Sequence, residues 1–201
     1  NAGSDPRAMT TTATPSEDGT HYVINGEKLW CTNGTKANVI VVMAVTPPKI
    51  ARGKERKQIT AFLVEMETPG VEIMHRCRFM GLKSLYNGVI RFTDVKIPRE
   101  TMILEEGDGL RLALKTLNTG RLSIPAGVTG NSKWCMKVNR KWTNERIQWG
   151  HPIGEHETIA GKQAKIASDT FAMDAVWKIA SAMADNKHFD IRLEAAIAKL
   201  F

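Results

Sequence analysis

The chain has 201 residues, 42% of them hydrophobic and 24% charged, which is ordinary for a globular protein with a buried core. Its longest apolar run, residues 39–45, is far shorter than the roughly 20 residues of a membrane-spanning helix. The formal net charge of +7 suits an anionic partner such as nucleic acid, an acidic membrane surface or a phosphorylated ligand. Three widely spaced cysteines without a CxxC pair argue against a disulfide framework and a zinc site, and favour a reducing compartment.

The first half of the chain has the pattern of β-strands. Tyr22 and Ile24, followed by Asn25-Gly26 and then Lys28, predict a β-hairpin, because Asn-Gly readily adopts the positive φ angles of a type I′ turn. Further strands are predicted over residues 39–45, 59–66, 71–74 and 88–98. Several strands without intervening helices predict an antiparallel barrel or sandwich.

The stretch KLWCTNG, residues 28–34, belongs to the second arm of this predicted hairpin. Strand alternation would place Trp30 and Thr32 on one face. A large flat ring beside a small hydroxyl fits ordinary half-buried sheet packing, and it also fits the wall of a site for a flat polar ring. The residues alone leave both interpretations open.

Basic residues gather between the Pro47-Pro48 pair, which we interpret as a break, and the strand predicted at 59–66. They are Lys49, Arg52, Lys54, Arg56 and Lys57. A solvated hairpin loop is the simplest explanation. No aromatic residues are interleaved with them and no nucleic-acid motif accompanies them, so we expect no nucleic-acid partner.

After Pro98 the apolar spacing becomes helical. The first helix is predicted from about Asp108, which is placed to serve as its N-cap, and Pro125 predicts a kink just after Arg121. Further helices are predicted over residues 131–144 and 157–186 and from about Asp190 onward. The predicted fold class is therefore α+β.

Five phrases in chain order together resemble the acyl-CoA dehydrogenase family of flavoenzymes. They are NAGSD at 1–5, YVINGEKLWCTNG at 22–34, GVIRFTDVKIPRE at 88–100, LNTGRLSIPAG at 117–127 and NERIQWGHPI at 144–153. The resemblance implies the family's middle β domain over residues 1–103 and the first helices of its C-terminal four-helix domain over 104–201. It also implies that the N-terminal helical domain and the last helices lie outside this chain.

The resemblance implies FAD as the cofactor. Trp30 would pack against the isoalloxazine ring, while the hydroxyl of Thr32 and nearby backbone amides, including that of Cys31, would hydrogen-bond the hydride-accepting edge. Donors at that edge stabilise negative charge as a flavin is reduced. Ser4 matches a family serine that lies near the flavin and the pantetheine arm of the substrate.

Two positions in the loop after residue 144 match family residues that reach the FAD of the neighbouring subunit. Arg146 and Gln148 would approach its pyrophosphate and adenosine, which implies a homodimer or homotetramer. His156 and Glu157 stand where many members have a glutamine that touches the cofactor, and SLYNG at 84–88 replaces the family's small hydroxyl residues. We therefore assign none of the family's contacts to these positions.

The segment that matches the family's contact with acyl-CoA consists of Asn118, Thr119, Gly120 and Arg121. The reaction needs a carboxylate base to take the α-proton. A minority of members carry it immediately before the arginine matched by Arg121, where this chain has Gly120, so we expect the base beyond Phe201. Glu194 lies among alanines and is interpreted as a structural or surface carboxylate.

The implied function is FAD-dependent oxidation of a fatty acyl-CoA to the trans-2-enoyl-CoA in fatty acid β-oxidation, with electrons passed to an electron-transfer flavoprotein. The insertion after Val45 and the LNTGR phrase most resemble long-chain and very-long-chain members. The alternatives are a flavin-binding relative without dehydrogenase activity, such as an assembly factor or DNA-associated member, and an acyl-CoA oxidase. The expected compartment is the cytoplasm in a bacterium or the mitochondrial matrix in a eukaryote, and no metal site is expected.

Overall fold

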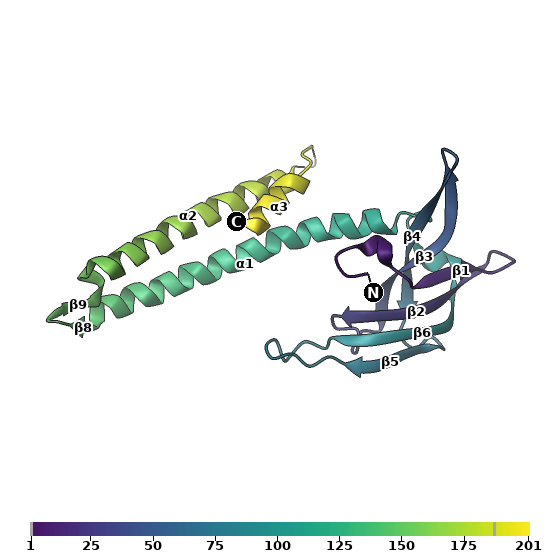
Figure 1. Ribbon diagram of the computed structural model, residues 1–201, viewed down its shortest axis with the longest axis horizontal. Coiled ribbons are helices and arrows are strands. Elements are labelled where there is room, and N and C mark those ends of the chain that lie inside the picture. Colours follow the sequence, from purple (N-terminus) through teal and green to yellow (C-terminus); the bar gives the residue numbers. More distant parts are fainter. Residues whose placement is uncertain (1, 187) are drawn as a thin grey trace. The chain divides into compact units, whose positions relative to one another are not determined.

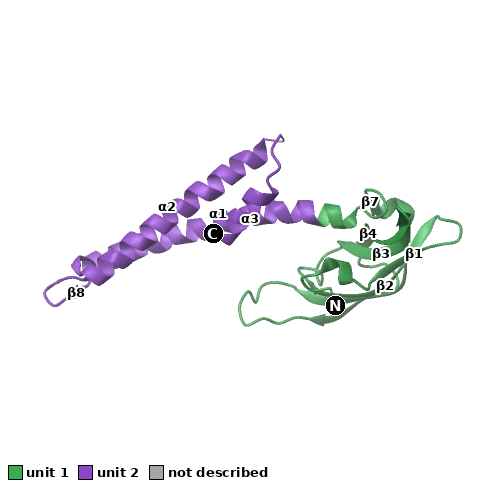
Figure 2. Ribbon diagram, turned by 45° about the horizontal axis from the view of Figure 1, so that its top comes forward, with its two compact units in different colours: residues 1–113 green, residues 114–201 purple. Residues whose placement is uncertain are grey.

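The computed structural model describes residues 2–186 and 188–201, and the chain divides into two compact units, residues 1–113 and 114–201 (Figure 1, Figure 2). The first unit is built mainly from strands and the second from helices. The domain boundary expected between residues 103 and 104 stays a prediction. Each unit is described by itself below.

Unit 1 contains a seven-stranded sheet in the order β5-β6-β2-β1-β3-β4-β7. Its strands are β1 Thr12–Pro15, β2 His21–Cys31, β3 Val39–Ala51, β4 Lys54–Glu65, β5 Val71–Arg76, β6 Gly88–Pro98 and β7 Met102–Ile103. Neighbouring strands are antiparallel except β1 and β3, which run parallel with Thr12 opposite Val45. The α+β class is confirmed. The sheet is mixed because the short β1, which the sequence did not predict, inserts between β2 and β3.

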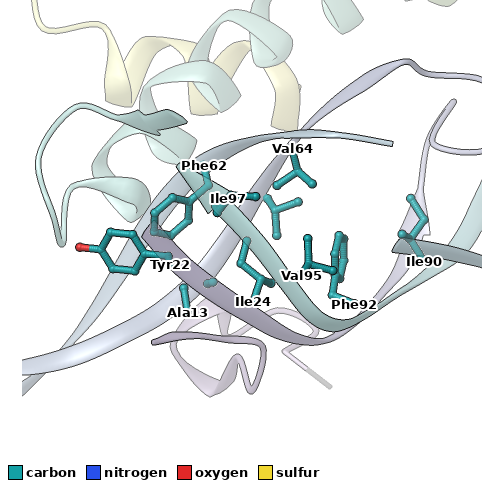
Figure 3. Close-up of a cluster of buried hydrophobic side chains, with 11 residues drawn as sticks. Ala13, Tyr22, Ile24, Phe62, Val64, Ile90, Phe92, Val95 and Ile97 are labelled. Carbon is teal, nitrogen blue, oxygen red and sulfur yellow. The ribbon is translucent and has the colours of Figure 1, made fainter. Parts of the chain in front are cut away.

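One face of this sheet carries the hydrophobic core of unit 1 (Figure 3). The core consists of Ala13, Tyr22, Ile24, Val42, Ala44, Phe62, Val64, Ile90, Phe92, Val95 and Ile97. The rings of Tyr22 and Phe62 meet with their centroids 4.9 Å apart. Since alternate residues of a strand share a face, the apolar positions of β2, β4 and β6 converge on one interior. Each large side chain buried there stabilises the fold by roughly 1.5–3 kcal/mol.

The hairpin predicted at Asn25-Gly26 is wrong, because β2 runs without a turn through both residues. The register with β6 shifts between Ile24 and Gly26, and Gly26 has a φ of 136°. A side chain at Gly26 would lie 2.8 Å from the Cα of Thr11. Asn25 bonds Asp94 twice: its Nδ2 donates to Oδ1 at 3.0 Å, and its Oδ1 accepts from the backbone N–H at 2.9 Å. The glycine therefore serves a β-bulge and a close backbone approach.

The strands β3 and β4 form a long hairpin that continues through Pro47 and Pro48. The register is irregular between Thr46 and Lys49, which is where prolines are tolerated within a sheet. The turn at the tip comprises Arg52 and Gly53, both with positive φ. The basic segment is thus mostly paired strand, and the loop is shorter than predicted.

As far as the structure describes it, unit 2 consists of three α-helices, the short 3-10 helix η3 (Ile153–Glu155) and a small hairpin. Their bounds are α1 Gly109–Glu145, whose first turn belongs to unit 1, β8 Ile147–Gln148, β9 His151–Pro152, α2 Glu157–Asp185 and α3 Arg192–Leu200. The helices α1 and α2 are linked by an ion pair in which Nζ of Lys133 lies 2.6 Å from Oδ1 of Asp174. The predicted starts after Asp108, at Glu157 and near Asp190 are confirmed.

The helix predicted over residues 131–144 is not a separate element. The helix α1 is continuous through Pro125, and the proline ring is buried within unit 2. Proline removes one backbone hydrogen bond. The hydrogen bonds of the flanking turns and the packing of a long helix can still keep the helix continuous on both sides of it. Among the described residues, none of the helices has both the length and the hydropathy needed to cross a bilayer.

Candidate functional site

The segment after Lys28 leaves the regular strand geometry and exposes an aromatic ring. The register with β6 shifts between Lys28 and Cys31, and Trp30 has a φ of 61°. This left-handed conformation is uncommon for a large side chain. Because β2 ends at Cys31, the alternation predicted for Trp30 and Thr32 does not apply, and both side chains are exposed, Trp30 at 59%.

The Trp30 ring packs against the ring of Phe79, with ring centroids 5.7 Å apart and planes inclined by 32°. Phe79 belongs to the connection between β5 and β6 and also borders a hollow of about 290 Å³. The residues lining it are Arg76, Cys77, Arg78, Phe79, Leu82, Lys83 and Leu85. The exposed indole therefore lies next to a hollow with three cationic side chains, which favours anionic groups nearby.

Asn87, directly before β6, lies against the backbone of the Trp30 segment. Its Nδ2 donates to the hydroxyl oxygen of Thr32 at 3.1 Å and to the carbonyl oxygen of Trp30 at 3.4 Å. The residue is only 5% exposed, and its Oδ1 is buried with no hydrogen-bond partner found among the described residues. The sequence showed only an unusual SLYNG loop here. Because Asn87 and Thr32 are 55 residues apart in the sequence, no local sequence pattern indicates their contact.

Cys31 is half-buried beside Lys28 and Gly34. Burial raises the pKa of the Cys31 thiol, partly offset by the charge of Lys28, so the thiol stays protonated near neutral pH. Burial also lowers the pKa of Lys28 to about 8, against an opposing effect of Cys31. Cys31 is therefore a packing residue whose carbonyl already accepts from the N–H of Gly34 at 3.1 Å, and the contact of its backbone with a cofactor stays a prediction.

Ser4 lies in an exposed turn near the start of unit 1. The turn is closed by a 3.0 Å hydrogen bond from the backbone N–H of Asp5 to the carbonyl of Ala2, and Gly3 has a φ of 51°. Among the described residues, no hydrogen-bond partner of the Ser4 side chain is found. Its placement near a flavin or a pantetheine arm stays a prediction.

Two side chains of the substrate segment predicted on α1 bond to each other. Nη1 of Arg121 donates to Oδ1 of Asn118 at 2.9 Å, as expected for side chains three residues apart on a helix. Both are half-buried, whereas Thr119 and Gly120 are exposed. The helix thus brings Asn118 and Arg121 together and turns Thr119 and Gly120 away. A side chain at Gly120 would meet nothing within 4 Å.

The predicted cofactor residues Arg146 and Gln148 lie in and beside the β8–β9 hairpin and are exposed. The carbonyl of Arg146 accepts from the N–H of Ile153 at 2.8 Å, which closes the base of the hairpin. Trp149 at its tip is 87% exposed and meets His156 edge-on at 5.4 Å. The hairpin presents a guanidinium, an amide and an indole to solvent, a donor set that suits phosphate and a flat ring.

No catalytic base can be assigned from the residues described. Glu194 on α3 is half-buried, and its Oε2 is buried with no hydrogen-bond partner found. Gly120, the other family position, has no side chain that could carry a proton. The described residues also contain no group of three or more His, Cys, Asp or Glu side chains that could hold a metal ion.

Within unit 1, the residues around Trp30 fit one kind of ligand. They offer a flat apolar surface, the Thr32 hydroxyl and a buried amide with one oxygen unpartnered. A flat ring with a polar edge would use the exposed indole surface and the Thr32 hydroxyl together, with the buried Asn87 amide holding that hydroxyl from behind, whereas an aliphatic or highly charged ligand would use only one of them.

Comparison with known proteins identifies the family. Residues 1–95 match the sequence model of the acyl-CoA dehydrogenase middle domain, and residues 107–201 match that of the acyl-CoA dehydrogenase C-terminal domain. The chain belongs to the acyl-CoA dehydrogenase family. Several curated relatives in this family are much longer than this chain.

The probable acyl-CoA dehydrogenase FadE10 of Mycobacterium tuberculosis is 49% identical over 199 residues, which are 99% of this chain and 30% of that protein. The mitochondrial very long-chain specific acyl-CoA dehydrogenase of Rattus norvegicus is 34% identical over 201 residues, covering 31% of its length. Butyryl-CoA dehydrogenase from Megasphaera elsdenii superposes with a TM-score of 0.85 at 31% identity, over 98% of this chain and 50% of that one. The chain thus spans between about a third and a half of these relatives.

Proposed function

We propose that the protein is an FAD-dependent dehydrogenase that oxidises a fatty acyl-CoA to the trans-2-enoyl-CoA. The observation that carries the proposal is the exposed Trp30 beside Thr32, held by Asn87, in a chain of this family. A similar acyl-CoA dehydrogenase from Bacillus anthracis, 29% identical with a TM-score of 0.78, was solved in complex with FAD. Bound FAD would supply the acceptor for the β-hydride of the substrate.

The residues of the chain supply binding and electrostatics for this reaction. Trp30 would cover a face of the flavin, and Thr32 would donate a hydrogen bond to its polar edge, where negative charge develops. Cys31 would contribute its backbone, and Ser4 would line the same side. Arg146 and Gln148 would hold the pyrophosphate and adenosine of the FAD of a second subunit, which makes the active form a homodimer or homotetramer.

On α1, the pair formed by Asn118 and Arg121 would fix the acyl-CoA near its thioester, with Thr119 and Gly120 beside it. The α-proton would be taken by a carboxylate outside residues 1–201, since Gly120 cannot do so. The electrons would pass to an electron-transfer flavoprotein. One structural neighbour, with a TM-score of 0.82, comes from a study of the electron-transferring flavoprotein of Acidaminococcus fermentans.

The proposal is tested by anaerobic titration of the native full-length protein with butyryl-, octanoyl- and palmitoyl-CoA while the visible flavin absorption is followed. We expect one of them to bleach the band, which demonstrates hydride transfer and ranks chain length. The sequence phrases favour palmitoyl-CoA. A yellow protein that none of the three bleaches would contradict dehydrogenase activity.

An acyl thioester oxidase is a second candidate, because the prolyl acyl carrier protein oxidase AnaB superposes with a TM-score of 0.86 at 26% identity. An oxidase and a dehydrogenase share the first half-reaction and differ in the electron acceptor. Admission of oxygen to the bleached protein separates them. Rapid return of the flavin band without electron-transfer flavoprotein would identify an oxidase, and slow return is expected for the dehydrogenase.

A further inference from the structure

The direction of the hydrogen bond between Asn87 and Thr32 follows from a third group, the carbonyl of Trp30. Nδ2 of Asn87 lies 3.4 Å from that carbonyl oxygen and 3.1 Å from the Thr32 hydroxyl oxygen. A backbone carbonyl can only accept hydrogen bonds. If the amide were reversed, Oδ1 would face the Trp30 carbonyl and two acceptors would repel each other. The NH₂ group therefore faces both oxygens, and Thr32 accepts.

This contact decides what the Thr32 hydroxyl can do. A hydroxyl has one hydrogen to donate and two lone pairs to accept with. Since Asn87 occupies a lone pair on one side, the hydrogen of Thr32 is left for a group on another side. Thr32 is exposed, so that group can come from a ligand.

We propose that Asn87 is a positioning residue of the flavin site, which makes Thr32 a committed hydrogen-bond donor toward the bound ring. The inference deepens the proposed function and rests on it. A donor whose orientation is already fixed needs no reorganisation when negative charge develops on its acceptor, so it stabilises that charge more than a freely rotating hydroxyl.

The burial of Asn87 supports a role beyond packing. The residue is only 5% exposed, yet its Oδ1 has no hydrogen-bond partner found among the described residues. An unpaired buried oxygen weakens a fold, and an apolar side chain of the same size would avoid that loss. The amide offsets this loss only through the two bonds of its Nδ2, to Thr32 and to the Trp30 carbonyl, so its place in the fold depends on the Trp30 segment.

The backbone around Asn87 is fixed by contacts on both sides. Its carbonyl accepts from the N–H of Cys77 at 2.9 Å, and the hydroxyl of Thr35 donates to the carbonyl of Tyr86 at 3.2 Å. Gly88, the next residue, pairs with Cys31 across the sheet. These contacts tie the amide to the same segment that carries Thr32, which is what a positioning residue requires.

The test is a double-mutant cycle in the native full-length protein. The variants are Asn87→Leu, Thr32→Val, Thr32→Ser and the double variant Asn87→Leu/Thr32→Val. The readouts are the reduction potential of the bound flavin and the rate at which acyl-CoA bleaches it. Thermal unfolding of each variant shows whether it folds.

We expect Asn87→Leu and Thr32→Val each to slow bleaching by about tenfold, the size of one lost hydrogen bond, and to make the potential more negative. Thr32→Ser keeps the hydroxyl and should stay close to the wild type. The double variant should be no slower than Thr32→Val, because the amide acts only through the hydroxyl. A further tenfold loss in the double variant would overturn the inference, as would an unchanged potential in Asn87→Leu.

Asn87→Asp adds a pH-dependent readout, and the same substitution in a Thr32→Val background separates the effect of the new charge from its effect on the Thr32 hydroxyl. An ionised carboxylate can only accept, so it would take the hydrogen of Thr32 away from the flavin. Once protonated, the same group can donate to Thr32, so the potential and the bleaching rate should recover as the pH falls through the pKa of the new carboxyl. A variant whose pH profile matches that of the wild type would overturn the inference.

The inference and the proposed function fail differently. If the wild-type protein is not bleached by any acyl-CoA, the proposed function is contradicted, and the inference falls with it. If the wild type is bleached and the effects of the two variants simply add, the dehydrogenase stands and only the role of Asn87 is rejected.

Discussion

The two units of the chain bury different kinds of side chain. Unit 1 encloses large apolar residues such as Phe62, which is 0% exposed, whereas unit 2 buries small ones such as Ala180, Ala195 and Thr170. Large apolar side chains of unit 2 remain exposed, among them Phe171 at 78%. Burial of large side chains provides most of the stabilisation of a fold. Unit 1 is therefore held by its own core, and unit 2 receives much less from its own residues.

The largest expected effect contrasts the same substitution in the two units. Phe62→Ala removes a fully buried ring that packs on Tyr22, and we expect it to lower the free energy of unfolding by about 3–5 kcal/mol. Phe171→Ala, in the exposed position, should change it by less than about 0.5 kcal/mol. Urea unfolding followed by circular dichroism measures both. Equal losses would refute the contrast.

The next effect concerns Lys28, a half-buried charged residue of unit 1. Burial lowers the pKa of Lys28 to about 8 from an ordinary value of 10.5. Between these pH values the unfolded chain holds more protons, so the free energy of unfolding should rise as the pH rises through this window. Below about pH 8 the cost of burying the charge is fully present.

Lys28→Met removes this charge. The substitution should raise the free energy of unfolding at neutral pH by about 1–3 kcal/mol. It should also flatten the increase of this free energy between about pH 8 and pH 10.5. Urea unfolding at several pH values measures it. Lys115→Met, at an exposed position of α1, is the matched control and should keep the rise. The same slope in the wild type and the Lys28 variant would contradict the account.

Two glycines of α1 provide a smaller test of how closely each unit is packed. A Cβ at Gly109, in unit 1, would lie 2.8 Å from the carbonyl oxygen of Ile59, whereas one at Gly127, in unit 2, would meet nothing within 4 Å. Gly109→Ala should therefore destabilise the protein by about 1–3 kcal/mol. Gly127→Ala should stabilise it by roughly 0.5–1 kcal/mol, because alanine favours helix. Thermal unfolding gives the sign of each, and two changes of the same sign would refute the contrast.

The smallest effect is expected at an ion pair in unit 2. Hydrogen bonds from Lys133 and Lys178 lower the pKa of Asp174 to about 2, so its contribution to stability is present above about pH 4 and lost as the pH falls through about 2. Asp174→Asn should reduce this acid sensitivity, measured as the urea midpoint between pH 5 and pH 2. Asp169→Asn, whose partner Lys165 lies on the same helix, is the control and should change it less. Identical acid profiles for the wild type and Asp174→Asn would contradict the assignment.

The sequence predicted the parts of the fold that depend on local pattern. The bounds of β6 and the start of α2 were found because period-two alternation and helical spacing are properties of neighbouring residues. The prediction of a turn at Asn25-Gly26 was wrong because it rests on two neighbouring residues, whereas residues distant in the sequence decide the backbone conformation there. Contacts with Thr11 and Asp94 keep this glycine inside a strand.

The same distinction applies to the candidate site. The resemblance singled out Trp30 and Thr32, and the pairing of Asn118 with Arg121 follows from helical spacing. The left-handed backbone at Trp30 and the contact of Asn87 with Thr32 could not be predicted. They arise where β2 and β6 meet, and no short stretch of the chain contains both sides of that contact.

The central claim is that Trp30 covers a bound flavin, and reconstitution of the native full-length apoprotein with FAD tests it most directly. We predict that the wild type and Trp134→Ala, which lacks an exposed tryptophan of unit 2, take up FAD and show its visible absorption band. Trp30→Ala should bind it at least about tenfold more weakly, since an aromatic contact is lost. A wild-type protein that takes up no FAD, or a Trp30 variant that binds it as tightly as the wild type, would contradict the claim.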